Sequence, residues 1–411
     1  MSNIRDINLY PSGEVKIRWV QAHMPVLGAI AEDFKREKPF SGLKVALSVH
    51  MEAKTAWFCR VLEMGGAEMH VTGCNPLSTQ DDVAAALAHG GMDVHAHHGA
   101  TEEEYMADID AVLECGPQII IDDGGDLVSR MHSKYTHLIP QVIGGCEETT
   151  TGIHRLLTME RKGELRFPMM LVNDAACKHF FDNRYGTGQS VWDGIMRTTN
   201  LIVAGKTVVV AGYGWCGKGV SMRAHGLGAK VIVTEVDPVR AIEAHMDGFT
   251  VMPMAEAARL GDLFITVSGC DDVIKAEHFE TMKDGAILAN AGHFDVEVNA
   301  AALRKMAVEH YEARHNIEAY VLPNGRTLYL LAEGRLVNLA SGDGHPAEIM
   351  DMSFAVQAMS SRYLADHRAE LPRGTIAVPQ EIDYAIASKK LQTLGIAIDT
   401  LSAEQKNYLG I

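Results

Sequence analysis

The chain has 411 residues, of which 47% are hydrophobic and 22% are charged, a composition typical of a globular protein with two or three domains. Its 37 basic and 53 acidic residues give a net charge of −16, which argues against a nucleic-acid or anionic-membrane partner, since both would need a basic face. The seven cysteines are scattered without a CxxC pair, the N-terminus lacks an apolar signal core, and no apolar run reaches the roughly 18 residues of a spanning helix. We therefore expect a reduced, cytoplasmic protein.

The first part of the chain alternates between short β-rich runs and helical stretches. Strands that end in polar residues are predicted at 43–50, 67–74, 92–98, 118–126 and 169–176. The helices between them are predicted at 54–66, 79–91 and 102–116. This alternation predicts a parallel sheet with helices on both faces and with active residues at the carboxyl ends of the strands.

A second α/β unit begins near residue 200. Its strands are predicted at 207–214, 230–237, 262–269 and 286–292. Residues 349–367 then predict one long helix, and a short helical tail begins at Ser402, where Gln405 completes a capping-box pattern.

A glycine-rich turn joins the first strand of this second unit to a helix. Gly212, Gly214 and Gly217 fit the pattern G-x-G-x-x-G, and Glu235 ends the next strand, 23 residues after Gly212. The glycines allow a tight turn that brings a pyrophosphate to the helix N-terminus, and the acid accepts a hydrogen bond from the ribose 2′-hydroxyl of NAD. The pattern therefore predicts NAD as cofactor, although a turn that merely needs glycines would look similar.

These elements together predict an α/β protein with two doubly wound parallel-sheet domains. A Rossmann domain that binds NAD, residues 185–345, is inserted into a discontinuous substrate-binding domain made of residues 1–184 and 346–385. A short tail covers residues 386–411. We expect hinge closure at the two crossings, near Arg184 and near His345.

Polar residues gather just before the first crossing, where Asn173, Asp174, Lys178, Asp182 and Asn183 lie close together in sequence. Four further motifs accompany them: DDGGDL (122–127), EETTTGIHRL (147–156), NAGHFDVE (290–297) and EGRLVNL (333–339). In this order and spacing the motifs resemble the S-adenosylhomocysteine hydrolase family, and the resemblance covers the chain from about residue 14 to its end. The chain resembles the short form seen in some archaea and thermophilic bacteria, which includes S-inosyl-L-homocysteine hydrolases.

The resemblance implies a reaction without net redox change. Bound NAD⁺ oxidises the ribose 3′-hydroxyl of a nucleoside thioether, a base removes the acidified C4′ proton, homocysteine leaves from C5′, water adds, and the ketone is reduced again. The expected substrate is S-adenosyl-L-homocysteine, which is recycled in the methyl cycle.

The resemblance also assigns roles to residues. Lys178 takes the 3′-hydroxyl proton, which requires a lowered pKa such as burial produces. Asp182 and Glu148 bind the ribose hydroxyls, and His50 and Asp123 form the acid–base pair at C4′ and C5′. The remaining matched positions are, for the active site and substrate, His293, Asn173, Thr55 and His345, and, for NAD, Thr149, Thr150, Thr151, Asn183, Asn290 and Asn338.

Each of these residues has a simpler interpretation when it is taken alone. Lys178 and Asp182 could form a surface ion pair at i,i+4 on a helix, and such a pair contributes a few tenths of a kcal/mol. His50 and Asp123, at neighbouring strand ends, could be satisfied structural residues. The full motif set favours the catalytic interpretation.

The purine-binding segment departs from the family pattern. Most members have Thr-x-Glu after a His-Met pair, and the Glu accepts from the adenine 6-amino group, whereas this chain has Glu52 and Lys54. Lys54 could donate to O6 of hypoxanthine while Glu52 accepts from N1–H, which makes S-inosyl-L-homocysteine the alternative substrate. The same pair with exchanged partners could read adenine, or the two side chains could satisfy each other.

Two further departures concern the C-terminus and the hinge. Many members end in a tail with Lys and Tyr that reaches the NAD site of a neighbouring protomer, but this chain stops at KNYLGI (406–411). The resemblance implies a homotetramer, and the shortened tail leaves a dimer open. Thr187 stands where many members have Cys.

Other functions fit the sequence less well. The run HAHH (95–98) suggests no metal site, because a strand would direct its histidines to opposite faces. An NAD-dependent hydroxy-acid dehydrogenase would give no reason for Lys178, Asp182 and Glu148 to occur together. A non-catalytic NAD-binding regulator would be expected to have lost one or more of His50, Asp123, Lys178 and Asp182, and all four are present.

Overall fold

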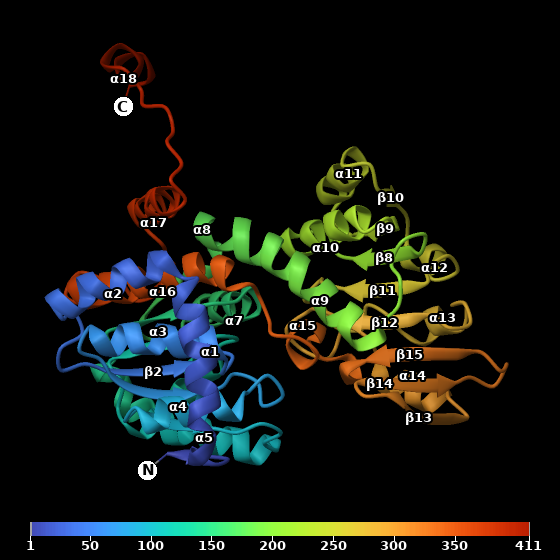
Figure 1. Ribbon diagram of the computed structural model, residues 1–411, viewed down its shortest axis with the longest axis horizontal. Helices are drawn as coiled ribbons and strands as arrows, with labels where there is room; N and C mark the ends of the chain where they lie inside the picture. Colours follow the sequence, from blue (N-terminus) through green and yellow to red (C-terminus); the bar gives the residue numbers. More distant parts are fainter. Residues whose placement is uncertain (1, 411) are drawn as a thin grey trace.

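The protein consists of two lobes, each built on one eight-stranded sheet, as Figure 1 shows for the computed structural model. These two sheets confirm the predicted α/β fold with two parallel-sheet domains. The structure describes residues 2–410. No helix among the described residues combines the length and the apolar character that crossing a lipid bilayer requires.

The sheet of the first lobe is parallel throughout. In sheet order its strands are β1 (Asn3–Ile4), β4 (Asp93–Ala96), β3 (Glu68–Thr72), β2 (Lys44–Ser48), β5 (Ile119–Asp122), β6 (Gly144–Glu147), β7 (Pro168–Leu171) and β16 (Gly374–Ala377). The five strands predicted in this part of the chain are present. Residue patterns do not indicate β6, because two of its four residues are glycines and none is β-branched.

Side chains alternate between two cores along the strands of this sheet. In β5, Ile119 and Ile121 face one core while Ile120 faces the other. The helices of the first core are α1 (Tyr10–Ala22), α2 (Pro25–Glu37), α3 (Ala53–Met64), α4 (Asp81–His89) and α16 (Ala347–Asp366). Those of the second are α5 (Glu102–Glu114), α6 (Asp126–Ser133) and α7 (Thr150–Arg161).

The sheet of the second lobe is parallel except at one edge. In sheet order its strands are β10 (Thr250–Val251), β9 (Lys230–Thr234), β8 (Thr207–Ala211), β11 (Leu263–Thr266), β12 (Ile287–Asn290), β15 (Thr327–Leu331), β14 (Ile317–Val321) and β13 (Glu309–Arg314). Strand β14 pairs antiparallel with both β15 and β13, a feature that the sequence pattern did not predict. All six residues of β13 are exposed, so this edge strand lacks the apolar run that marks a buried parallel strand.

Helices also cover both faces of the second sheet. On one face lie α9 (Thr187–Thr199), α10 (Trp215–Gly226) and α11 (Pro238–Met246). On the other lie α12 (Met254–Ala257), α13 (Ala276–Phe279) and α14 (Ala300–Met306). The alternation along β8, where Val208 and Val210 face the first core and Val209 the second, is that of a doubly wound sheet.

Short elements connect the lobes and complete the chain. The first crossing runs through η3 (Val172–Asp174), α8 (Ala176–Lys178) and the π-helical segment η4 (His179–Gly186), and the return crossing follows η5 (Ala332–Gly334) and α15 (Val337–Ala340). The other short helices are η1 (Ile7–Leu9) and η2 (Thr136–Gln141).

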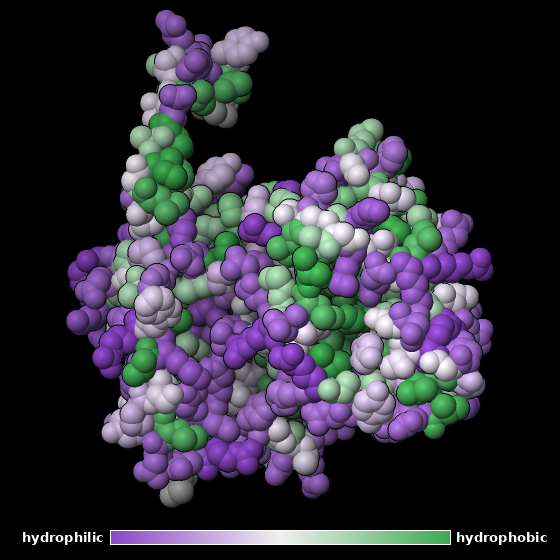
Figure 2. Space-filling view, turned by 45° about the vertical axis from the view of Figure 1, so that its right-hand side comes forward, coloured by the Kyte–Doolittle hydropathy of each residue, from purple (hydrophilic) through white to green (hydrophobic). Residues whose placement is uncertain are grey.

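The C-terminal segment comprises α17 (Gln380–Thr393), an extended stretch and α18 (Ala403–Leu409). Helix α17 packs against the first lobe, where Ile382 and Ile386 join the core, whereas the stretch after it and α18 project away from both lobes (Figure 1). The predicted capping box between Ser402 and Gln405 is confirmed. The stretch between the two helices exposes Leu394, Ile396, Ile398 and Leu401. Figure 2 shows apolar residues gathered along the projecting arm.

Candidate active site

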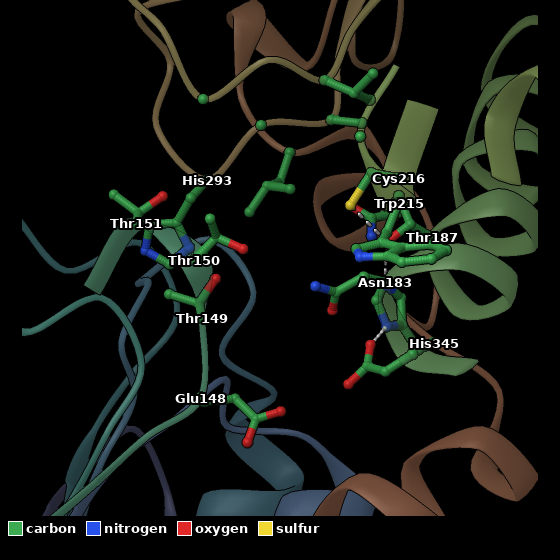
Figure 3. Close-up of a pocket in the computed structure, with 18 of the residues that line it drawn as sticks. Glu148, Thr149, Thr150, Thr151, Asn183, Thr187, Trp215, Cys216, His293 and His345 are labelled. Atoms are coloured by element: carbon green, nitrogen blue, oxygen red, sulfur yellow. Dashed lines mark hydrogen bonds and ion pairs between the residues drawn. The ribbon is translucent and has the colours of Figure 1, made fainter. Parts of the chain in front are cut away.

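The carboxyl ends of strands from both sheets open onto one cavity of about 460 Å³. Most of the predicted site residues line it: His50, Glu52, Lys54, Thr55, Asp123, Glu148, Thr149, Thr150, Thr151, Lys178, Asp182, Asn183, Gly212, Gly214, Glu235, His293, Asn338 and His345. Figure 3 shows two groups of these residues on opposite walls, with Glu148, the threonines and His293 facing Asn183 and His345. The predicted dinucleotide-binding turn and the predicted acid–base residues therefore line the same cavity.

Lys178 is the centre of a buried polar cluster. Its ammonium nitrogen Nζ lies 2.9 Å from Asn183 Oδ1, 3.2 Å from Asp182 Oδ2 and 3.4 Å from Glu148 Oε1. The sequence predicted Lys178 and Asp182 on one helical face, and the π-helical turn of η4 explains why Asn183 joins them. Its i→i+5 spacing brings the fifth residue after Lys178 onto the same face as the fourth.

The pKa values of this cluster depend on opposing effects. Burial alone would lower the pKa of Lys178, but Asp182 and Glu148 outweigh burial and raise it above its usual value. The expectation of a lowered pKa for Lys178 is therefore wrong, because two carboxylates stabilise its ammonium form. Burial raises the pKa of Glu148 to about 7. Burial would also raise the pKa of Asp182, but Lys178 and His345 outweigh it and hold that pKa below its usual value.

Helix α16 holds both carboxylates from behind. Gln357 Nε2 donates to Glu148 Oε2 at 2.6 Å, and Ser353 Oγ donates to Asp182 Oδ2 at 2.8 Å. The other oxygen of Asp182 contacts Nδ1 of His345. The apolar run of this helix suggests that it only fills the core. Ser353 and Gln357 are polar residues four positions apart within that run, and this spacing was the one signal in the sequence for their role in the site.

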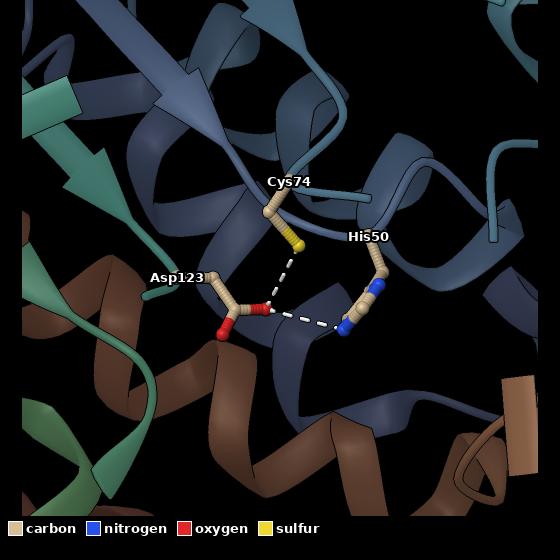
Figure 4. A group of neighbouring side chains, drawn as sticks. All are labelled: His50, Cys74 and Asp123. Atoms are coloured by element: carbon tan, nitrogen blue, oxygen red, sulfur yellow. Dashed lines mark hydrogen bonds and ion pairs between the residues drawn. The ribbon is translucent and has the colours of Figure 1, made fainter. Parts of the chain in front are cut away.

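His50 and Asp123 lie at the carboxyl ends of β2 and β5 and meet near Cys74 (Figure 4). Asp123 Oδ2 lies 3.7 Å from His50 Nε2 and 3.4 Å from the Cys74 Sγ atom, which donates to it. Burial lowers the pKa of His50 to about 4, against the opposing effect of Asp123, so its imidazole is neutral at pH 7. On the far side of the ring, Nδ1 lies 2.6 Å from Ser78 Oγ.

These three side chains are also the one group among residues 2–410 whose ligand atoms converge as they would around a metal ion, all within 4.8 Å. Burial raises the pKa of the Cys74 thiol well above its usual value, with Asp123 adding to the effect. A thiol is a poor metal ligand, so the arrangement does not favour a metal site.

His293 brings the second lobe into contact with this pair. Its ring centroid lies 6.2 Å from that of His50. It also packs against Gly124, where φ is +111° and an added Cβ would come within 2.8 Å of His293 Nε2. Only glycine fits this left-handed position without displacing His293.

The turn between β8 and α10 has the features of a dinucleotide site. Gly212 has a φ of +107°, and an added Cβ at Gly217 would lie 2.0 Å from Gly212 O, so the third glycine serves close helix–strand packing. Glu235 lies at the end of β9 and accepts from the backbone N–H of Tyr213 at 2.7 Å, which fixes its carboxylate at the rim of the turn. The residues present therefore fit the adenosine and pyrophosphate part of NAD.

The cavity wall at Asn338 fits an amide-bearing group. Asn338 donates from Nδ2 to Ser190 Oγ at 3.2 Å, but its buried Oδ1 has no hydrogen-bond partner among the described residues. A buried acceptor of this kind needs a donor from a ligand, and the carboxamide of a nicotinamide provides one.

Glu52 and Lys54 begin helix α3 at the edge of the cavity. Glu52 Oε2 accepts from the Lys54 backbone N–H at 3.0 Å and lies 2.8 Å from Lys54 Nζ. Lys54 Nζ also donates to the carbonyl oxygen of Asp343, 2.9 Å away on the return crossing. The two side chains do satisfy each other, as one of the three interpretations of the sequence expected, but each retains capacity for a ligand.

Comparison with known proteins now identifies the family. Residues 1–134 match the model described as S-adenosyl-L-homocysteine hydrolase, and residues 183–344 match the model of its NAD binding domain. An S-inosyl-L-homocysteine hydrolase of Methanocaldococcus jannaschii is 58% identical over 100% of this chain and 98% of its own length. The chain belongs to the S-adenosyl-L-homocysteine hydrolase family.

Relatives of similar identity carry two different names. The S-inosyl-L-homocysteine hydrolase of Methanococcus maripaludis is 56% identical over 100% of this chain and 98% of its own length. The adenosylhomocysteinase of Thermococcus kodakarensis is 57% identical over 99% of this chain and 96% of its own. Among solved structures, a dipicolinate synthase chain from Bacillus halodurans shares the fold, with a TM-score of 0.50 and 14% identity over 80% of this chain and 99% of its own.

Three predicted positions of this family member lie behind the cavity wall. Asn173 accepts from Asn183 Nδ2 at 2.9 Å and supports the Lys178 cluster from behind. Asn290 bonds to the backbone of its own loop, including Phe294 O at 2.8 Å, and Gly217 has the packing role described above. These side chains shape the site without facing the ligand space.

Other residues of the wall were not predicted from the sequence. Trp215 and Cys216 stand within the glycine turn and line the cavity, and the Trp215 ring stacks on His179 with centroids 5.2 Å apart. Cys216 Sγ donates to Thr187 Oγ1 at 3.6 Å, so the Thr in place of the usual Cys links the turn to the start of helix α9. The motif pattern allows any residue at these two positions and carried no signal for them.

Proposed function

We propose that the protein catalyses the NAD-dependent, reversible hydrolysis of S-adenosyl-L-homocysteine to adenosine and homocysteine through a 3′-keto intermediate. The observation that carries this proposal is the single cavity in which the dinucleotide turn of one lobe faces Lys178, Asp123 and His50 of the other. A simple hydroxy-acid dehydrogenase needs a hydride acceptor and one acid–base group, and it gives no use for the second pair at the ends of β2 and β5.

The Lys178 cluster serves the ribose 3′-hydroxyl. When bound, NAD⁺ supplies a reversible hydride acceptor for C3′. Lys178 is an ammonium, so it can take the hydroxyl proton only by passing one on, and Glu148 Oε1 lies 3.4 Å away. With its pKa raised to about 7, Glu148 is the group that accepts this proton, while Asp182 stays ionised and anchors the sugar.

His50 and Asp123 serve C4′ and C5′. The neutral imidazole of His50 accepts a proton, and the adjacent Asp123 carboxylate stabilises the imidazolium that forms. His293 approaches the pair from the second lobe, so closure of the lobes excludes water while the ketone exists. We place the hinge at the crossings near Arg184 and His345, with domain limits at 1–184 plus 346–385 and at 185–345.

The purine edge supports a second candidate, S-inosyl-L-homocysteine. Two of the three N–H bonds of the Lys54 ammonium go to Glu52 and to Asp343 O, which leaves one donor, and no described residue donates to Glu52 Oε1. One donor beside one acceptor complements the O6 and N1–H of hypoxanthine. Lys54 stands where the family has a Glu that accepts from the 6-amino group of adenine, and this observation favours the inosyl substrate.

Thiol release from both thioethers, measured side by side with purified protein and added NAD⁺, tests the proposal. Release from either substrate supports the reaction, and release from neither would refute it. The double variant Glu52→Thr/Lys54→Glu restores the common family pattern, so it should shift the ratio of kcat/KM values toward the adenosyl substrate by about tenfold or more. An unchanged ratio would show that this pair does not read the base.

We also propose a cytoplasmic homo-oligomer, a tetramer or else a dimer. The apolar arm of Leu394, Ile396, Ile398 and Leu401 is exposed in the single chain, and a second copy would cover it. Light scattering should show a tetramer or dimer for the full chain and a smaller particle for a chain that ends at Thr393. A monomeric full chain would contradict the proposal.

A further inference from the structure

Two buried carboxyls, Asp122 and Glu147, stand next to carboxyls that line the cavity. Each is followed in sequence by one of them, Asp123 at the end of β5 and Glu148 at the end of β6. Asp122 and Glu147 are themselves register partners in the sheet. Both are 0% exposed, neither lines the cavity, and neither forms an ion pair with a described residue. Burying an acidic side chain is unfavourable in free energy, so two such residues at this place suggest a functional reason for their presence.

Glu147 connects the two loops that carry catalytic carboxyls. Its Oε1 atom accepts from the backbone N–H of Gly124 at 2.9 Å and from that of Thr149 at 3.0 Å. Gly124 directly follows Asp123, and Thr149 directly follows Glu148. A single oxygen atom therefore links the loop that carries Asp123 to the loop that carries Glu148, and so fixes the spacing of these two carboxyls.

The surroundings are built to admit this side chain. An added Cβ at Gly152, on the first turn of α7, would lie 2.1 Å from Glu147 Cδ. Asp122 completes the support, because its two oxygens accept from the N–H groups of Asp123 at 3.1 Å and Val128 at 2.9 Å. Its carbonyl oxygen accepts from the Glu148 N–H at 2.9 Å.

We propose that Glu147 is a positioning residue that holds Asp123 and Glu148 in register, so that both halves of the reaction act on one bound ribose. The inference rests on the proposed function and concerns residues that do not touch the ligand space. It predicts that loss of Glu147 slows 3′-oxidation and C4′ proton removal together.

The chemical state of Glu147 decides which substitution preserves the role. Burial, with Asp122 adding to the effect, raises the pKa of Glu147 well above its usual value. When the acid is protonated, Oε1 can accept both N–H groups as a carbonyl-type oxygen. The amide oxygen of Gln offers the same acceptor in the same volume, whereas Met fills the volume and offers none.

The test uses the full-length protein loaded with NAD⁺ and mixed with 4′-deuterated adenosine or inosine. Formation of reduced cofactor, followed by absorbance, reports 3′-oxidation. Loss of deuterium to water, taken per amount of reduced cofactor present, reports C4′ proton removal, because only the ketone exchanges at C4′. We expect Glu147→Met to lower both rates by about tenfold or more and Glu147→Gln to keep both within about threefold of wild type. Gly152→Ala, which displaces the Glu147 carboxyl without removing it, should lower both rates as Glu147→Met does.

Asp351 provides a matched structural control. It is also buried and accepts two backbone N–H groups, from Val26 and Leu27, but it lies outside the cavity. Asp351→Asn should lower the melting temperature without separating or changing the two rates. A fall in only one rate for Glu147→Met, or an equal fall for Glu147→Gln, would overturn the positioning role.

The proposed function fails in a different way. Wild-type protein that forms no reduced cofactor and releases no deuterium would refute the reaction itself. An active wild-type protein with an unaffected Glu147→Met variant would refute the positioning role alone.

Discussion

Gln357 sets the pH at which the Lys178 cluster can accept a proton. Its amide donates to Glu148 Oε2 at 2.6 Å, and this bond stabilises the ionised carboxylate and lowers its pKa. Replacement by Met keeps the volume and removes the donor. A hydrogen bond to a charged group contributes about 1.5–3 kcal/mol, so its loss should raise the pKa of Glu148 by about one to two units.

The expected change in rate follows from the ionised fraction. A pKa of about 7 leaves half of the Glu148 carboxyls ionised at pH 7. A shift of one to two units leaves about 9% to 1%, so 3′-oxidation at pH 7 should slow by about 5- to 50-fold. The sign is fixed by the charge of the acceptor: the rate rises with pH through the pKa of Glu148, and raising the pH should restore the variant.

The assay is stopped-flow absorbance of reduced cofactor after NAD⁺-loaded protein is mixed with nucleoside, repeated across pH. Ser360→Ala is the control, because Ser360 lies on the same helix and its buried hydroxyl has no partner among the described residues. The control should keep the wild-type pH profile. A Gln357→Met profile with the wild-type midpoint, or a loss of rate that raised pH does not restore, would refute Glu148 as the proton acceptor.

Two further predictions concern the junction of the lobes. An added Cβ at Gly219 would lie 1.7 Å from Arg184 O, so Gly219→Ala should lower the melting temperature and the NAD content of the purified protein; Gly226→Ala, on the same helix with open space around it, should change neither. Trp215 lines the cavity and stacks on His179, so its fluorescence should change as NAD⁺ is added, and Trp215→Phe should abolish that change; an equal change in the variant would place the cofactor elsewhere.

The sequence predicted the elements whose residues carry a local signal. Alternating apolar runs revealed the central strands of both sheets, and the glycine turn with Glu235 revealed the dinucleotide site. Strand β6 was missed because GGCE has no β-branched residue, although its end carries Glu147 and Glu148. The hairpin at the edge of the second sheet was missed because all six residues of its outer strand, β13, are exposed, so the strand has no apolar face that a pattern could reveal.

The chemistry of the site depended on contacts that sequence spacing does not contain. Burial of Lys178 was expected to lower its pKa, and only the structure shows two carboxylates within 3.4 Å that reverse the shift. Likewise no spacing pattern indicated the π-helical turn that brings Asn183 beside Lys178. Gly219 and Gly188 let helices α10 and α9 approach closely at this point, a fit that no local propensity encodes.

The charges of the Lys178 cluster explain why three ionisable groups can be buried together. One ammonium and the ionised Asp182 compensate each other, and Glu148 is the remaining variable. When Glu148 is protonated, the cluster is neutral; when it is ionised, the cluster carries one negative charge that Gln357 partly stabilises. Because the two states are close in free energy near pH 7, a proton can move between the substrate hydroxyl and Glu148 without creating an isolated buried charge. The same balance requires Glu148 to stay within reach of Lys178, which is the role proposed above for the hydrogen bond from the Thr149 N–H to Glu147.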